Sequence, residues 1–222
     1  MWLIVLYILG ALLAAFLLLV AFFGVCALCV DPRKEYEKNS PFYRFLVDCV
    51  SAAMIRFLRI RVHITGFEQV PEGTRVLFVS NHRSNFDPII TWYVMKKWKI
   101  AYISKPSNFR IPFFGRIIRK CCFLPIDREN PRNAIITINK AAGLLQKQEV
   151  SIGIYPEGTR SKSGILLPFH NGVFKIAKKA DAPVVVFSII GFFYVKSRGK
   201  HKFAERFIPT VKTKDEQETE NE

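Results

Sequence analysis

The pattern of hydrophobic and polar positions changes twice along the chain. Residues 2–30 carry no charged side chain, residues 39–60 repeat apolar side chains every three or four positions, and from Arg61 short apolar runs alternate with helical stretches. These patterns predict a long apolar helix, an amphipathic helix and an α/β domain. We therefore divide the chain into an anchor at 1–38, an amphipathic helix at 39–60, a domain at 61–210 and a polar acidic tail at 211–222. The tail is predicted to be disordered.

The apolar run at 2–30 predicts a membrane anchor. As a helix it would extend roughly 44 Å, which is enough to cross a bilayer with tilt. A cleaved signal peptide is the alternative, but such a peptide has a basic n-region and a shorter apolar core. Arg33, Lys34 and Lys38 follow the run, and the positive-inside rule then places the rest of the chain in the cytoplasm. We expect a single-pass protein with its domain on the cytoplasmic face of a membrane.

The next segment has the pattern of an amphipathic helix. Ser40 and Pro41 predict its start, because serine can cap a helix and proline suits the first helical position. The apolar side chains that recur are Phe42, Phe45, Leu46, Cys49, Val50, Ala53, Met54, Phe57 and Leu58, with Arg44, Arg56 and Arg59 among them. This helix could lie in the membrane interface with its arginines toward phosphates, or pack on the core of the domain. One apolar stripe does not distinguish the two arrangements.

The remainder reads as an α/β domain. Strands are predicted at 61–65, 75–80, 99–104, 150–155 and 183–190, and helices at 88–97, 131–148 and 172–179. Strands that alternate with helices predict a mixed, largely parallel sheet layered by helices. After Tyr194 the chain becomes more charged, and no closing strand can be placed there from the sequence.

The charge composition of the chain indicates which class of binding partner it favours. The formal net charge is +15, from 33 Lys and Arg against 18 Asp and Glu, which beside a membrane span suits anionic headgroups and anionic substrates. Nucleic acid is the generic alternative for a basic protein, but the chain carries no nucleic-acid motif. The five cysteines do not suggest disulfides, and the adjacent Cys121 and Cys122 have no evident base beside them that would make a nucleophile.

The first candidate site lies between a predicted strand and the helix that follows it, at Asn81 to Pro88. Polar groups at the carboxyl end of a strand face the crevice where α/β folds commonly place their sites. His82 and Asp87 can meet there if the loop closes onto a helix capped by Asp87. The carboxylate would then fix the imidazole tautomer and leave the second nitrogen as a base. Alternatively, Asp87 is only an N-cap and His82 only a loop residue. A metal site is not predicted, because no third ligand has a suitable spacing.

At this point the sequence resembles a known family. The pattern Asn81-His82-x4-Asp87-Pro88 is similar to the defining NHxxxxD block of the glycerolipid acyltransferases. Three further blocks follow in that family's order: KPSNFRIPFFGRIIRKCCFLPIDR at 105–128, YPEGTRS at 155–161, and LPFHNG at 167–172 with APVV at 182–185. The resemblance covers roughly residues 62–190, and four blocks in order are highly specific.

The pentapeptide PEGTR occurs twice, at 71–75 and at 156–160. The first copy precedes the strand that delivers His82, so it lies at the opposite end of that strand, where Pro and Gly form an ordinary turn. The second copy follows a strand and can converge on His82 if the two strands run parallel. Gly158 would then let backbone N–H groups approach a phosphate, and Arg160 could bind its oxygens bidentately.

The resemblance implies an activity and a set of roles. It implies transfer of a fatty acyl group from acyl-CoA or acyl-carrier protein to the sn-2 hydroxyl of lysophosphatidic acid, giving phosphatidic acid in phospholipid biosynthesis, at a bacterial cell membrane. His82 and Asp87 would be catalytic, and the residues expected to bind substrate are Glu157, Gly158, Thr159, Arg160, Lys105 and Arg128. No metal or organic cofactor is expected, because a thiolate is a good leaving group.

Two other functions are kept as alternatives. The acceptor could be glycerol-3-phosphate or another lysophospholipid, with the same chemistry. In a different class, the chain could be a non-catalytic membrane protein that binds anionic lipid, in which case substitution of His82 would change nothing.

Overall fold

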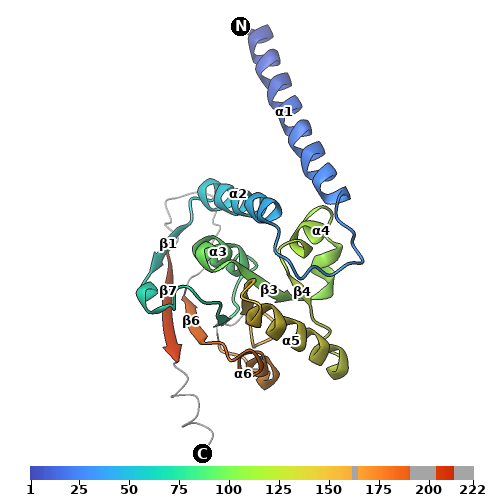
Figure 1. The fold of residues 1–222 in the computed structure, drawn as a ribbon. Helices are drawn as coiled ribbons and strands as arrows, with labels where there is room; N and C mark the ends of the chain where they lie inside the picture. The colour runs from blue at the N-terminus through green and yellow to red at the C-terminus, as the bar shows by residue number, and fades with distance from the viewer. Residues whose placement is uncertain (162–164, 191–203, 213–222) are drawn as a thin grey trace, which may run out of the picture.

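The computed structural model describes residues 1–161, 165–190 and 204–212. The first helix, α1 (Trp2–Leu28), projects from a globular α/β body (Figure 1). By its length and composition α1 could cross a membrane, and none of its most apolar part is buried against the body. Only its last turns dock, where Cys26 and Ala27 are buried and the Tyr43 hydroxyl donates a hydrogen bond to the Cys26 carbonyl (2.9 Å).

The amphipathic helix α2 (Pro41–Phe57) begins where its sequence predicts. Ser40 is its N-cap and Pro41 its first residue, but the Ser40 side chain makes no capping hydrogen bond. Tyr43, Leu46 and Ile55 are buried against the body. The exposed apolar side chains of α2 are Phe42, Phe45, Val50 and Phe57. Helix α2 therefore packs on the core with one side and presents further apolar side chains outward.

In the described residues, seven strands form one sheet in the order β1-β7-β6-β2-β5-β3-β4. The strands are β1 (Arg61–Ile64), β2 (Leu77–Ser80), β3 (Ile100–Ser104), β4 (Leu124–Pro125), β5 (Ser151–Ile154), β6 (Val184–Ile190) and β7 (Ala204–Lys212). Strands β6, β2, β5, β3 and β4 are parallel, while β7 is antiparallel to β6 and parallel to β1. The prediction of a mixed, largely parallel sheet is confirmed. Runs such as Leu77 to Val79 are fully buried, as strands covered on both faces require.

The connections place helices on both faces of the sheet. From β2, α3 (Asp87–Val94) leads to β3 in one direction along the sheet. From β4, α5 (Pro131–Gln146) leads back to β5, and α6 (Lys175–Ala180) continues from β5 to β6. Because such crossovers are right-handed, α3 lies on one face and α5 and α6 on the other. Accordingly α2 packs on α3, whereas α5 packs on α6.

Several short elements were not predicted. They are α4 (Phe114–Arg119), the two-residue strand β4 and the 3-10 turns η1 (Phe67–Gln69), η2 (Lys96–Trp98), η3 (Pro106–Arg110) and η4 (Asn171–Phe174). Strand β7 forms in the charged region, lies between β1 and β6, and extends to Lys212, past the expected start of the tail at 211. The rest of the predicted tail, 213–222, lies outside the described residues.

Gly115, the first buried residue of α4, allows a close backbone approach. A Cβ at this position would come within 2.3 Å of the Phe109 carbonyl oxygen. Gly115→Ala is therefore expected to destabilise the domain by about 1–3 kcal/mol, because backbone atoms must move to relieve the overlap. The measurement is the midpoint of thermal unfolding of the purified protein in detergent.

Gly143→Ala is the matched control, because a Cβ at Gly143 would meet nothing within 4 Å. Gly143 lies inside α5, where alanine is the better helix former. The control should unfold at the wild-type temperature or slightly above it. Equal midpoints for the two variants would contradict the close approach at Gly115.

Candidate active site

The candidate site lies at one edge of the sheet. Strand β2 sits between β5 and β6 and is parallel to both, so the loops that follow β2 and β5 leave the same edge. This is the condition under which the second PEGTR copy was expected to reach His82. Asn81 joins the edge to β6, since its amide donates to the Ile189 carbonyl (3.0 Å) and accepts from the Ile189 N–H (2.7 Å).

His82 and Asp87 form a direct pair. The Nδ1 atom of His82 lies 2.8 Å from Oδ2 of Asp87. The Asp87 side chain is fully buried, while 17% of the His82 side chain is exposed. Because a carboxylate only accepts, Nδ1 carries the proton and Nε2 keeps a lone pair. The alternative in which the two residues act separately, as a cap and a loop residue, is therefore not supported.

The capping prediction for Asp87 is wrong. Phe86 is the N-cap of α3, Asp87 is its first residue and Pro88 its second. The Asp87 carboxylate turns back toward the loop, where Oδ2 also accepts from the N–H groups of Arg83 and Ser84 (2.7 Å each). Three donors on one oxygen hold the carboxylate in place for His82.

Two tyrosine rings lie beneath the histidine; Tyr155 begins the third block, but neither ring was expected to contact His82. The Tyr155 ring stacks on the His82 imidazole with centroids 4.2 Å apart, and the Tyr102 ring is parallel to that of Tyr155 at 6.0 Å. Burial raises the pKa of both phenols, so they stay neutral. Gly153 of β5 makes room for the Tyr102 ring, because a Cβ there would lie 2.6 Å from that ring. The stack limits the rotation of the imidazole.

Glu157 connects the loops around His82. It was expected to contact substrate, but it is 3% exposed and both of its oxygens accept hydrogen bonds from backbone N–H groups. Oε1 accepts from His82 (2.8 Å) and Oε2 from Leu167 (3.0 Å). The Ser161 N–H also donates to the His82 carbonyl (2.9 Å). These bonds give Glu157 the geometry of a residue that positions His82.

Gly158 forms the turn beside this pair. Its φ of +69° is a left-handed conformation that glycine adopts without strain. A Cβ at Gly158 would lie 3.1 Å from the His170 ring and 3.9 Å from Nε of Arg128, so these two side chains flank the turn. Desolvation lowers the pKa of the Arg128 guanidinium. His170 belongs to the fourth block, and its backbone N–H donates to the Pro156 carbonyl (2.9 Å).

The remaining predicted contacts lie at the same edge. Thr159 and Arg160 follow Gly158 and are exposed. Lys105 is exposed where β3 ends, and β3 pairs with β5 in parallel. Lys105, Arg128 and Arg160 thus lie at the edge of the sheet that carries His82 and the Gly158 turn, an arrangement suited to a phosphate group.

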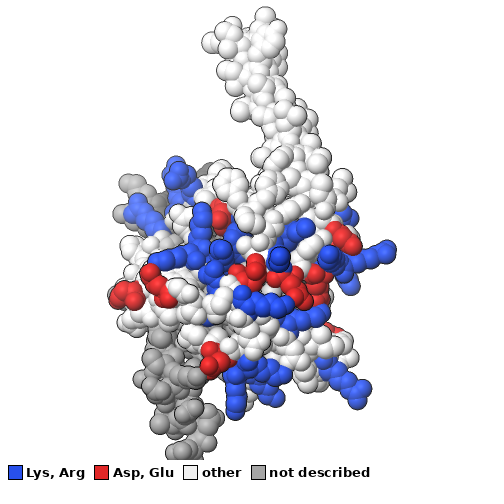
Figure 2. All heavy atoms as spheres, viewed as in Figure 1, with Lys and Arg blue, Asp and Glu red and all other residues white. Residues whose placement is uncertain are grey.

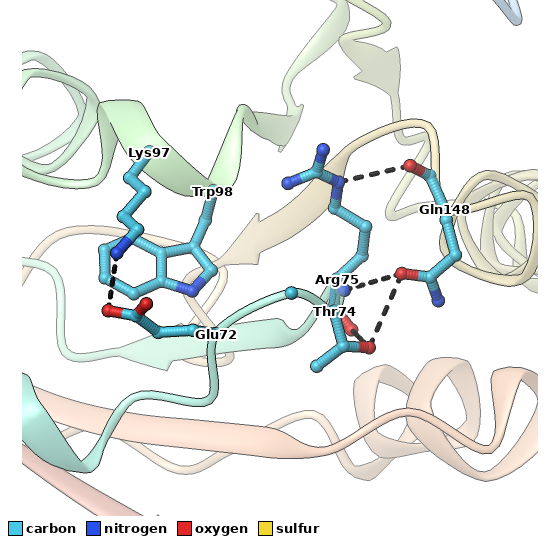
Figure 3. A pocket seen from close by; sticks show the side chains of 7 residues that line it. Glu72, Thr74, Arg75, Lys97, Trp98 and Gln148 are labelled. Carbon is cyan, nitrogen blue, oxygen red and sulfur yellow. Dashed lines mark hydrogen bonds and ion pairs between the residues drawn. The ribbon is translucent and has the colours of Figure 1, made fainter.

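The first PEGTR copy lies at the opposite edge, in the turn before β2 (Figure 3). Its Arg75 donates through Nε to the Gln148 carbonyl (3.2 Å), and the Arg75 N–H donates to the Gln148 side chain (2.8 Å). Lys97 pairs with Glu72 (2.5 Å). These groups line a hollow of about 240 Å³, and their bonds serve the turn itself. The copy is structural, as its position predicted.

The adjacent Cys121 and Cys122 are not nucleophiles. Burial raises the pKa of the Cys121 and Cys122 thiols to about 12, so both remain thiols at neutral pH, and all five cysteines are free. Within residues 1–161, 165–190 and 204–212, no group of three or more His, Cys, Asp or Glu side chains could hold a metal ion.

The chain is similar in sequence to proteins of one named class. The chain is 36% identical over 119 residues to a 1-acyl-sn-glycerol-3-phosphate acyltransferase of Cocos nucifera, covering 54% of this chain and 38% of that protein. It is 32% identical over 112 residues to the enzyme of the same name from Haemophilus influenzae, covering 50% and 46%. The aligned part thus spans less than half the length of these two relatives.

A crystal structure with a similar fold is known. The crystal structure of the 1-acyl-sn-glycerophosphate (LPA) acyltransferase of Thermotoga maritima superposes with a TM-score of 0.62 at 22% identity, covering 80% of this chain and 74% of that one. The likeness shows the fold. The model of the family described as Acyltransferase matches residues 61–190, which contain the His82–Asp87 pair and the second PEGTR copy, and the chain therefore belongs to this Acyltransferase family.

Proposed function

We propose that the protein transfers a fatty acyl group from a thioester donor to the sn-2 hydroxyl of lysophosphatidic acid. The observation that carries this proposal is the His82–Asp87 pair, which leaves Nε2 as a base at the edge of the sheet that also carries the Gly158 turn. Arg128 flanks that turn and Arg160 follows it. The names of the two relatives above supply the acceptor class.

The reaction follows from this geometry. Nε2 of His82 removes the proton of the acceptor hydroxyl as its oxygen attacks the thioester carbonyl carbon. The carbon–oxygen bond forms, the carbon–sulfur bond breaks, and the proton passes from His82 to the departing thiolate. Asp87 stabilises the imidazolium during the transfer, and the Gly158 to Arg160 turn holds the acceptor phosphate. No cofactor is needed for these steps, and acyl-CoA or acyl-carrier protein serves as donor.

Two other cationic side chains at this edge of the sheet are proposed to bind a further phosphate group of the substrates. Lys105 and Arg128 lie near the ends of β3 and β4 and suit a phosphate of acceptor or donor. In place of a direct contact, Glu157 is proposed to act by holding the His82 and Leu167 loops, because both its oxygens are already bonded to backbone N–H groups.

The domain is proposed to work at the membrane that α1 spans. Figure 2 shows that α1 carries no charged side chain and that Lys and Arg gather on the body beyond it. Arg33 and Lys34 follow α1 directly, which favours a cytoplasmic domain, and the exposed apolar side of α2 suits the bilayer interface. Anionic lipid is thus both the environment and the source of the acceptor.

Acyl transfer from labelled acyl-CoA to lysophosphatidic acid, by membranes that contain the protein, tests the proposal. Arg160→Ala is expected to raise KM for the acceptor about tenfold or more, because a charged hydrogen-bonded pair is worth about 1.5–3 kcal/mol. Arg75→Ala, the matched arginine in the first PEGTR copy, should keep the wild-type KM.

Glycerol-3-phosphate, other lysophospholipids and acyl-carrier protein are tested as substrates in the same assay. No transfer with any of these substrates, together with unchanged binding of anionic lipid in a His82 variant, would favour the non-catalytic alternative.

A further inference from the structure

We propose that the loop at 111–114 is a second membrane contact, which inserts its aromatic side chains into the interface of the bilayer that α1 spans. The inference rests on the proposed membrane location of α1. This segment comprises the connection from η3 to α4 and Phe114, the first residue of α4. It exposes three large apolar side chains, Ile111 at 46%, Phe113 at 44% and Phe114 at 44%. Neighbouring exposed residues of this size and kind indicate an interaction surface.

The backbone of this loop is held in a conformation that costs energy. Phe113 has φ 58° and ψ −58°, and the Phe114 N–H donates to the Pro112 carbonyl (2.6 Å). This is a γ-turn of the rare, strained kind, centred on a bulky residue. The close approach of Gly115 to Phe109 fixes the turn from the other side. Strain of this kind persists where the surroundings enforce it and commonly marks function.

The contact between Phe113 and α1 indicates how deep the loop lies relative to a bilayer that α1 spans. A Cβ at Gly24 would lie 3.5 Å from Cε1 of Phe113, and Gly24 is four residues before Leu28, where α1 ends. Phe113 is therefore level with a point about 6 Å inside the end of the helix. In Figure 1, α4 lies against the base of α1. Any bilayer that α1 spans must reach the neighbourhood of this loop.

The length of α1, compared with the thickness of a bilayer, places the contact between Gly24 and Phe113 at the membrane interface. Helix α1 has 27 residues and extends about 40 Å, roughly 10 Å more than the hydrocarbon core of a bilayer. The excess puts its last turns, Gly24 included, where the hydrocarbon meets the headgroups. Apolar side chains such as Phe and Leu bury themselves at this boundary when a segment lies in the interface. Arg110 and Arg116 flank the loop, and no acidic residue occurs in 105–126, which suits anionic headgroups.

The loop also has a functional position. It follows η3, which begins directly after the carboxyl end of β3, and that end belongs to the edge that carries His82. Insertion of the loop would hold this edge against the lipid surface, so that an acceptor with a long acyl chain reaches the site without leaving the bilayer.

Tryptophan fluorescence in vesicles tests the proposal. Phe114→Trp is made in a Trp2→Phe background, so that only the buried Trp92 and Trp98 contribute a constant signal. The protein is reconstituted in phosphatidylcholine and phosphatidylglycerol vesicles whose acyl chains are brominated either near the headgroup or near their middle. The introduced tryptophan should lose fluorescence, and more with bromine near the headgroup.

Ile136→Trp in the same background is the matched control. Ile136 is 52% exposed on α5, on the face of the sheet opposite α3, and its tryptophan should not be quenched. Equal quenching of the two variants, or none for Phe114→Trp, would overturn the proposal. The measurement needs no substrate, so its failure is separate from a failure of acyl transfer.

Discussion

His82→Ala is expected to lower kcat for acyl transfer by about 10²–10⁴-fold, the usual contribution of a positioned general base. The Nδ1–Oδ2 contact of 2.8 Å fixes the tautomer, so only Nε2 is left to take the hydroxyl proton. The Tyr155 stack holds the ring on which that nitrogen sits. Steady-state kinetics at saturating acceptor and donor measure the effect, and KM for the acceptor should change little, because the phosphate contacts come from another loop.

His63→Ala is the control for a histidine outside the site. His63 lies on β1 and is exposed, and its variant should keep the wild-type kcat. Wild-type turnover in His82→Ala would exclude His82 as the base. In that case the acyl transfer proposed for this site would need another proton acceptor.

The sequence predicted those parts of the fold that have a local pattern. Strand β5 was expected at 150–155 and is Ser151–Ile154, and α5 was expected at 131–148 and is Pro131–Gln146. Strand β4 has only two residues, too few for a period to appear. The partners of β7 are β1 and β6, and a charged strand of this kind is defined by such long-range pairing.

In the candidate site, too, local features could be predicted from the sequence and long-range contacts could not. The motif spacing was sufficient to pair His82 with Asp87, because both lie in one loop and the following turn of helix. It was insufficient for Tyr155 and Glu157, whose contacts depend on how the β2 and β5 edges meet in space. The capping prediction for Asp87 failed because its carboxylate accepts hydrogen bonds from His82, Arg83 and Ser84 in the preceding loop, and not from N–H groups of α3.

Glu157→Gln is expected to lower kcat by about 10²-fold while leaving KM for the acceptor nearly unchanged. The carboxylate accepts one N–H from His82 and one from Leu167. A glutamine has one acceptor oxygen, so one of these N–H groups would face the NH₂ of the amide and the loop would move. A displacement of about 1 Å at a catalytic base costs about this much. The measurement is kcat and KM for the acceptor, with the unfolding midpoint recorded in parallel.

Glu149→Gln is the matched control, and the comparison decides between two roles for Glu157. Glu149 also accepts a backbone N–H, from Asn39 (2.8 Å), but it precedes β5 and so lies at the edge away from His82. Its variant should lose stability at most and keep kcat. If Glu157→Gln instead raised KM and left kcat unchanged, Glu157 would contact the acceptor directly, as the sequence motif implies. A fall in kcat alone would make it a positioning residue, which acts on the acceptor only through the backbone of His82.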